Sequence, residues 1–226
     1  MAGRVLSRYS RDNSEFDRAV AFIDATFAVA LTLLVTTLDI SSNPSAWDNL
    51  GDFYDSMGSQ VLSFAISFVV IAGYWLAHYR LFASFAAIDH QLIVVNLFML
   101  ASIVLLPFTT ETAGNPDIND LPLPTVVLAV NVAAVSTAFT LIYVMAHRRG
   151  LLRTDPTQHE FQWGAAICFI PAIVFLASIP IAYWVDPGYA QLSWLSLVPI
   201  NVILSRVSSR DDRSRGIHQG PAGDPG

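Results

Sequence analysis

The stretch RAVAFIDATFAVALTLLVTT, residues 18–37, decides the fold of this chain. Apart from Arg18 at its start and Asp24 inside it, the stretch holds no charged residue. An α-helix needs about 20 apolar residues to cross the hydrocarbon core of a bilayer. We therefore predict that residues 18–40 form a membrane-spanning helix.

The rest of the sequence has the composition of a membrane protein. Of its 226 residues, 54% are hydrophobic and 13% are charged, whereas a soluble domain has roughly 25% charged residues. Further apolar stretches of spanning length predict an all-α integral membrane protein with six transmembrane helices. The predicted spans are residues 18–40, 57–79, 89–111, 122–147, 162–184 and 189–206.

The arginines indicate how these spans are oriented. Basic residues in short loops mark the cytoplasmic side of a membrane protein, and every arginine falls on one side of the predicted spans. Both termini are therefore predicted to be cytoplasmic. Residues 1–17 form the N-terminal segment, 18–206 the transmembrane domain, and 207–226 a disordered tail. The formal net charge of −6 argues against a nucleic-acid partner.

Asp24 is the most informative polar residue of the first span. It lies about 9 Å along the helix from Arg18, at a depth where inserting an acidic side chain costs roughly 2–3 kcal/mol. Its partner should come from another helix, because six residues rotate Arg18 about 120° away around the helix axis. Trp75 and His78 on the second span, and Asn96 on the third, are expected at a similar depth. These five residues form a predicted polar network near the inner face.

This network has two interpretations that the residues leave open. Its hydrogen bonds either lock three helices together, or they form a proton relay or gating switch based on His78.

A stripe of side chains on the first span is the second pattern. Steps of three and four residues place these side chains on one helix face. Several are small or carry a hydroxyl, which suits close packing of helices in lipid as well as the lining of a pore. The stripe consists of Phe22, Ala25, Thr26, Val29, Thr32, Leu33 and Thr36.

Together these residues resemble the prokaryotic members of the transmembrane protein 175 family of potassium-permeable channels. The family signature on the first helix is arginine, three residues, then Phe-Ser-Asp; here Arg18, Phe22, Ile23 and Asp24 have that spacing. The similarity continues in YWLAHYRLF at 74–82, NLF at 96–98 and LLPF at 105–108. It covers roughly residues 16–112, and beyond them only the plan of six spans agrees.

The resemblance implies that four copies surround a central pore lined by the first helix of each. Carried over by position, the side-chain rings that select and gate fall at Val29, at Thr32 or Leu33, and at Thr36. The chain would then be a homotetrameric potassium channel of the cell membrane. Its partners would be potassium ions and the lipid bilayer, with no cofactor and no metal site other than transient potassium in the pore.

Two departures from the family pattern affect this expectation. Ile23 replaces the signature serine, so the polar network around Asp24 should be thinner than in relatives. Thr36 stands where relatives usually have a bulky aliphatic residue, and Val29 is smaller than the common isoleucine or leucine. We expect a wider or wetter constriction and weaker discrimination of potassium over sodium.

The expected mechanism relies on side chains. No Thr-Val-Gly-Tyr-Gly run is present to build a carbonyl-lined filter, and no helix has arginine at every third position to sense voltage. A leak-type pore would instead select by the cost of dehydration, which is smaller for potassium than for sodium. The outer acids Asp48, Asp52 and Asp55 either concentrate cations at the mouth or only reflect topology.

Three other classes of function compete with a channel. A proton-coupled or cation secondary transporter could use Asp24 and His78, but transporters often show an internal repeat and none is evident here. An enzyme is not expected, because the sequence lacks a Gly-x-Ser-x-Gly elbow and a His-Glu-x-x-His pair. A structural scaffold would show no ion permeability after reconstitution.

Overall fold

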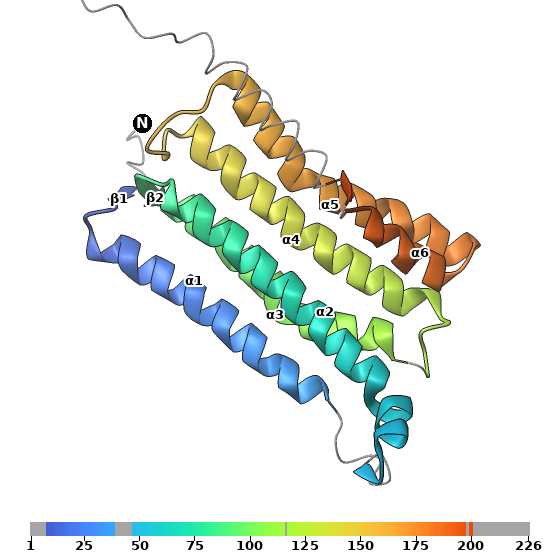
Figure 1. Cartoon of the computed structure of the whole chain (residues 1–226). Coiled ribbons are helices and arrows are strands. Elements are labelled where there is room, and N and C mark those ends of the chain that lie inside the picture. Colours follow the sequence, from blue (N-terminus) through green and yellow to red (C-terminus); the bar gives the residue numbers. More distant parts are fainter. Residues whose placement is uncertain (1–7, 39–46, 116, 198, 201–226) are drawn as a thin grey trace, which may run out of the picture.

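A computed structural model describes residues 8–38, 47–115, 117–197 and 199–200. This part of the chain is a bundle of α-helices with one small two-stranded sheet at one end (Figure 1), so the predicted all-α fold is confirmed. The elements are β1 (Arg8–Ser10), α1 (Ser14–Leu33), the 3₁₀ turn η1 (Leu34–Thr37), α2 (Leu50–Ala83), β2 (Ala87–Asp89), α3 (His90–Gly114), α4 (Pro122–Arg148), α5 (Gln158–Trp184), α6 (Pro187–Ser193) and the 3₁₀ turn η3 (Trp194–Ser196).

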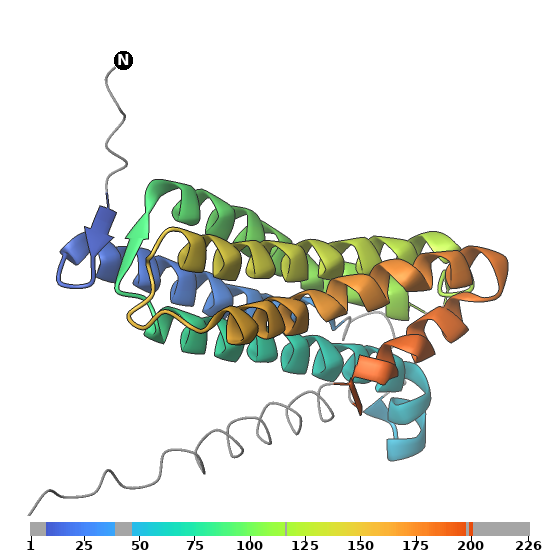
Figure 2. The ribbon, with the colours of Figure 1, turned by 90° about the horizontal axis from the view of Figure 1, so that it is seen from above.

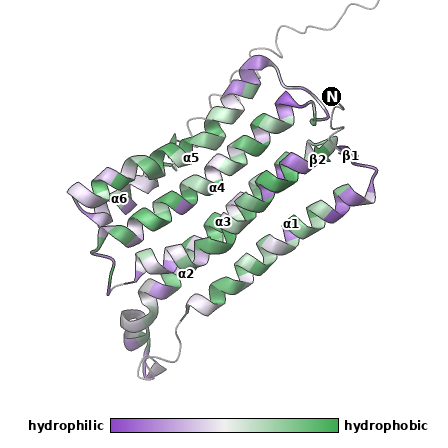
Figure 3. Cartoon of the chain, turned by 180° about the vertical axis from the view of Figure 1, so that it is seen from behind, coloured by the Kyte–Doolittle hydropathy of each residue, from purple (hydrophilic) through white to green (hydrophobic). Residues whose placement is uncertain are grey.

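Five helices among the described residues are long and apolar enough to cross a membrane. They are Ser14–Thr37, which joins α1 to η1, the Gln60–Ala83 part of α2, and the whole of α3, α4 and α5. They correspond to the first five predicted spans, and Figure 3 shows hydrophobic residues along most of their length. The sixth predicted span, 189–206, begins in α6 and η3. Its residues 201–206 lie outside the described residues, so this span stays a prediction.

The start of α1 lies four residues before the predicted boundary at residue 18. Asn13 has an extended backbone, and its side chain accepts a hydrogen bond from the Glu15 backbone nitrogen at 3.1 Å. The acids Glu15 and Asp17 lie in the first turn, where the helix dipole favours negative charge. A boundary drawn from apolar residues misses this turn because every residue that starts the helix except Phe16 is polar.

The buried face of α1 explains how this helix joins the bundle. Its buried residues follow the spacing of one helix face, and they belong to the hydrophobic core shared with α2, α3 and α4. Only 22% of the apolar window of the first span is buried, as in α5 (22%) and the second span (17%), against 50% for α3 and 61% for α4. Figure 1 shows α1 at the edge of the bundle. The buried residues of α1 and η1 are Phe16, Ile23, Phe27, Ala30 and Leu34.

Residues 8–13, before α1, are tied to the end of the bundle at which α2 ends and α3 begins. β1 pairs antiparallel with β2, which places Arg8 opposite Asp89. The Arg11 guanidinium donates hydrogen bonds to the carbonyls of Ala83 at 3.2 Å and Phe85 at 3.3 Å, and these carbonyls follow the last turns of α2. Figure 2 shows β1 and β2 at the same end as the connection between α4 and α5. The segment therefore holds the start of α1 against two other parts of the chain.

Candidate functional site

The predicted ring residues lie on the face of α1 that the protomer leaves uncovered. The exposed fractions of Val29 and Leu33 are 52% and 41%, and Thr32 and Thr36 are also exposed. Phe22, one more member of the stripe, is 57% exposed. Because α2 and α3 contact the opposite face, the stripe is free to face a neighbouring copy, a lumen or lipid.

The threonines of this face hold their hydroxyl groups in a defined orientation. Thr32 Oγ1 donates to the Val29 carbonyl at 2.8 Å, and Thr36 Oγ1 donates to the Leu33 carbonyl at 2.7 Å. Each hydroxyl proton is thereby used within the helix, so the oxygen keeps lone pairs that can accept from water or coordinate a cation. The exposed face of α1 therefore alternates aliphatic groups with hydroxyl oxygens.

Asp24 receives its hydrogen bond from the second helix. Trp75 Nε1 donates to Asp24 Oδ1 over 3.0 Å, and this contact joins α1 to α2. The partner of Asp24 thus comes from a different helix, as expected for a carboxylate inside a membrane-spanning segment.

His78 lies in a separate pair. Its Nε2 atom is 2.8 Å from Asn96 Oδ1, and the Asn96 amide nitrogen donates to the Leu92 carbonyl at 2.9 Å. Because the amide nitrogen is used in this way, the amide oxygen is the acceptor and His78 Nε2 is the donor. The His78 ring is 3% exposed and stacks on Phe82 with ring centroids 4.1 Å apart. This pair joins α2 to α3.

Arg18 does not join the predicted network, and that part of the prediction is wrong. Its guanidinium lies 3.5 Å from Glu15 Oε1 on the exposed surface of the first turns of α1. The reason is the rotation of about 120° that six residues produce, which turns Arg18 away from Asp24. The single network expected from the sequence is therefore two separate pairs, Asp24 with Trp75 and His78 with Asn96.

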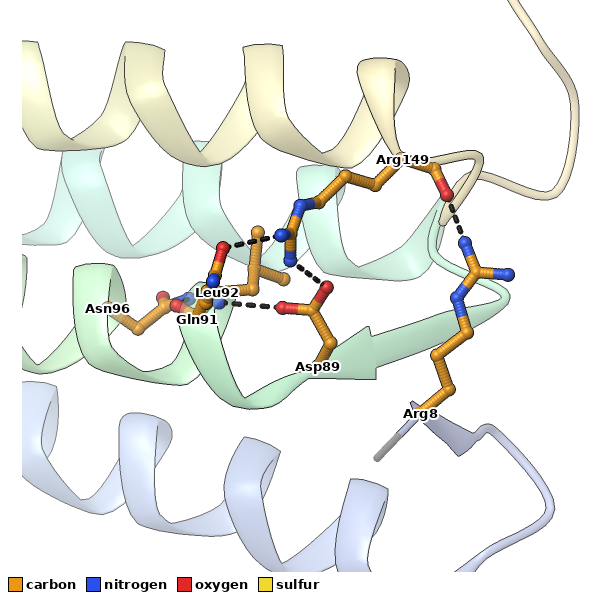
Figure 4. Close-up of polar contacts among 6 residues, drawn as sticks. All are labelled: Arg8, Asp89, Gln91, Leu92, Asn96 and Arg149. Atoms are coloured by element: carbon orange, nitrogen blue, oxygen red, sulfur yellow. Dashed lines mark hydrogen bonds and ion pairs between the residues drawn. The ribbon is translucent and has the colours of Figure 1, made fainter. Parts of the chain in front are cut away.

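A third polar cluster, at the start of α3, was not predicted (Figure 4). Asp89 is 2% exposed, forms an ion pair with Arg149, and caps α3 by accepting from the Leu92 backbone nitrogen at 2.9 Å. Arg149 also donates to the Gln91 side chain, and its own carbonyl accepts from the Arg8 guanidinium. The only sequence signal for this cluster is an aspartate placed directly before an apolar helix, which is a pattern typical of N-caps.

The described residues also limit what else the site can hold. Among them, no three histidine, cysteine, aspartate or glutamate side chains gather where a metal ion could bind. The chemistry available at the stripe is that of aliphatic surfaces and hydroxyl oxygens.

Comparison with known proteins relates this arrangement to other membrane proteins. The family described as endosomal/lysosomal potassium channel TMEM175 matches residues 18–107. A potassium channel of Streptomyces collinus is 34% identical over 100 residues, which are 43% of this chain and 47% of that protein. The endosomal/lysosomal proton channel TMEM175 of Mus musculus is 25% identical over 182 residues, which are 74% of this chain and 36% of that protein.

A solved structure has the same fold. It is the crystal structure of a lysosomal potassium-selective channel TMEM175 homolog from Chamaesiphon minutus, which aligns with a TM-score of 0.69 at 21% identity. The alignment covers 85% of this chain and 99% of that one. The chain spans less than half of the length of the two curated relatives named above. With its five long apolar helices, it is a multi-pass membrane protein.

Proposed function

Because the chain belongs to the TMEM175 family, we propose that it is a potassium-permeable cation channel of the cell membrane. In this proposal four copies place their α1 helices around a shared axis, and the stripe of α1 lines the pore. The bacterial relative from Streptomyces collinus is named a potassium channel, which supports potassium as the ion.

The observation that carries the proposal is the uncovered stripe on an otherwise well-anchored helix. α1 buries one face in the core and is held by Asp24 to α2, yet Val29, Leu33 and both ring threonines stay exposed along the span. Hydroxyl groups interleaved with aliphatic ones suit a surface that is wet part of the time better than one always in contact with acyl chains. A lumen between neighbouring copies of α1 provides such a surface.

Selection and gating would then come from rings of side chains. A ring of valine, leucine or threonine conducts while it is wide enough to hold water and blocks by dewetting when it narrows. Each ring removes part of the hydration shell of an ion. The free-energy cost of this dehydration is larger for sodium than for potassium, because the smaller sodium ion binds water more strongly. The lone pairs of Thr32 and Thr36 would return part of the lost coordination. Opening and closing by dewetting involves no gating charges, so we describe the proposed channel as leak-type.

The polar pairs would position the pore helix. Asp24 with Trp75, and His78 with Asn96, connect α1, α2 and α3 at similar depth. A proton-coupled or cation transporter would need Asp24 and His78 at a common site. Their separate partners favour the helix-locking interpretation of these residues over a transport site.

Reconstitution into potassium-loaded liposomes tests this function. We expect a flux above about 10⁵ ions per second per channel, which a carrier with a slow conformational step in every cycle cannot reach. Replacing Val29 with phenylalanine should fill the lumen and abolish most of this flux. The matched control is Val94→Phe on α3, because Val94 is 50% exposed and Val29 is 52% exposed. Equal flux in both variants, or flux at carrier rates, would refute the proposal.

A further inference from the structure

Two arginines, Arg80 in the last turn of α2 and Arg153 in the connection from α4 to α5, lie at the same end of the bundle. The Arg153 backbone nitrogen donates to the Ser84 carbonyl at 2.9 Å, and Phe85 forms an isolated bridge with Leu152. Ser84 follows Arg80 by four residues, which is about one helical turn and places both on the same face of α2. The connection from α4 to α5 thus places the backbone of Arg153 at the end of α2, about one helical turn beyond Arg80.

These two arginines differ from Arg18 and Arg149, which form ion pairs with carboxylates. Arg149 is paired with Asp89, and Arg18 with Glu15. Within the part of the chain that the structure describes, neither Arg80 nor Arg153 forms an ion pair, and both are exposed. Two neighbouring guanidinium groups without a carboxylate attract an anion, and their planar forks match a phosphate.

An exposed apolar surface leads along α2 to this pair. Val69 and Leu76 are 69% and 41% exposed. Gly73 lies between them, and a Cβ atom added there would meet nothing within 4 Å. Steps of four, three and four residues place Val69, Gly73, Leu76 and Arg80 on one face. The distance from Val69 to Arg80 along the helix is about 16 Å, close to half of a hydrocarbon core of about 30 Å.

We propose that this surface binds an anionic phospholipid of the inner leaflet. One acyl chain lies along Val69, Gly73 and Leu76, where the glycine leaves room for it. The phosphate lies between Arg80 and Arg153, at the depth where the apolar surface ends. This surface fits a phospholipid because its apolar part is about as long as one leaflet of the bilayer and ends at two arginines without ion pairs.

Native mass spectrometry of the purified full-length protein tests this proposal, with phosphatidylglycerol and phosphatidylcholine as the probes. We expect the wild-type protein to retain phosphatidylglycerol in preference to phosphatidylcholine. Each of Arg80→Gln and Arg153→Gln should lower phosphatidylglycerol affinity about fivefold. The control is Arg148→Gln at the end of α4, which removes the same charge from an exposed arginine and should leave the affinity unchanged.

Three results would overturn the proposal. The first is equal retention of both lipids by the wild-type protein. The second is an equal loss of phosphatidylglycerol in Arg148→Gln, which would indicate only diffuse attraction. The third is a change of oligomeric state in the Arg80→Gln, Arg153→Gln double variant in lipid-free detergent, which would assign this surface to a second copy of the chain. Circular dichroism that matches the wild-type spectrum establishes that each variant is folded.

Discussion

At the scale of single residues, Asp24 accepts a hydrogen bond from Trp75 while His78 is bonded to Asn96. A carboxylate and an imidazole that relay a proton must exchange it with each other or with shared water. Here each has its own partner on a neighbouring helix. Asp24 therefore joins α1 to α2, and His78 joins α2 to α3.

The substitution Asp24→Asn separates the positioning role from a relay role. Asparagine keeps an oxygen that can accept from Trp75 Nε1 but cannot carry a proton. We expect potassium flux within about twofold of wild type, since the hydrogen bond persists. Asp24→Leu, which removes the acceptor, should lower stability by about 0.5–1.5 kcal/mol because the hydrogen bond between α1 and α2 is lost. Thermal unfolding and liposome flux measure the two effects. Loss of flux in a stably folded Asp24→Asn variant would favour the transporter.

The polar residues also show what the sequence could predict. The depth of Asp24 and the need for a partner outside its own helix follow from helix geometry, and they led to Trp75. The division of the network into two pairs could not be predicted, because it depends on rotations of α2 and α3 about their own axes. Nothing in the sequence predicts the ion pair of Arg149 with Asp89, because the two residues are 60 positions apart.

At the scale of elements, β1, β2 and the ion pair of Asp89 with Arg149 join one end of the helix bundle. Asp89 is almost fully buried and also caps α3. Losing either partner leaves the other charge without compensation in a largely desolvated place. Residues 8–13, before α1, thus pack against the helix bundle, and the apolar pattern alone does not reveal this because short polar strands have no such pattern.

A double-mutant cycle tests this ion pair. We expect Asp89→Leu and Arg149→Leu each to lower the free energy of unfolding by about 3 kcal/mol. The double variant should lose about as much as one single variant, because the second substitution removes an already unpaired charge. Arg148→Leu, the adjacent exposed arginine, serves as the control and should change stability by less than about 0.5 kcal/mol. Additive losses in the double variant, measured by denaturant unfolding in detergent, would contradict a direct interaction.

At the scale of the whole molecule, α1 is one of five candidate spans among the described residues, and it lies at an edge with its stripe uncovered (Figure 1). The spans and the all-α fold follow from hydropathy. A lumen between copies does not follow from hydropathy, because the pattern of one chain does not show which of its faces a neighbouring copy covers. The assembly of four copies therefore stays a proposal based on the stripe and on the family.

The size of the ring residues predicts the selectivity of such an assembly. In the proposed pore, Val29 and Thr36 would remove less of the hydration shell of an ion than larger aliphatic residues would, so the wild-type channel should discriminate weakly between potassium and sodium. Replacing Val29 with leucine and Thr36 with isoleucine should raise the permeability ratio about fivefold, equivalent to about 1 kcal/mol of added dehydration cost for sodium. Reversal potentials under bi-ionic conditions measure this ratio. An unchanged ratio would show that these residues do not form the selecting rings.

Block of the current by a thiol reagent tests most directly whether α1 lines a lumen. The chain has a single cysteine, Cys168, so a Cys168→Ser background allows one new thiol at a time. We predict that a charged, water-soluble thiol reagent blocks the potassium current of Val29→Cys. Ala28→Cys is the control on the same helix, exposed but turned about 100° from Val29, and its current should persist. Block of Ala28→Cys with unaltered current through Val29→Cys would place the stripe away from the axis and contradict the proposed pore.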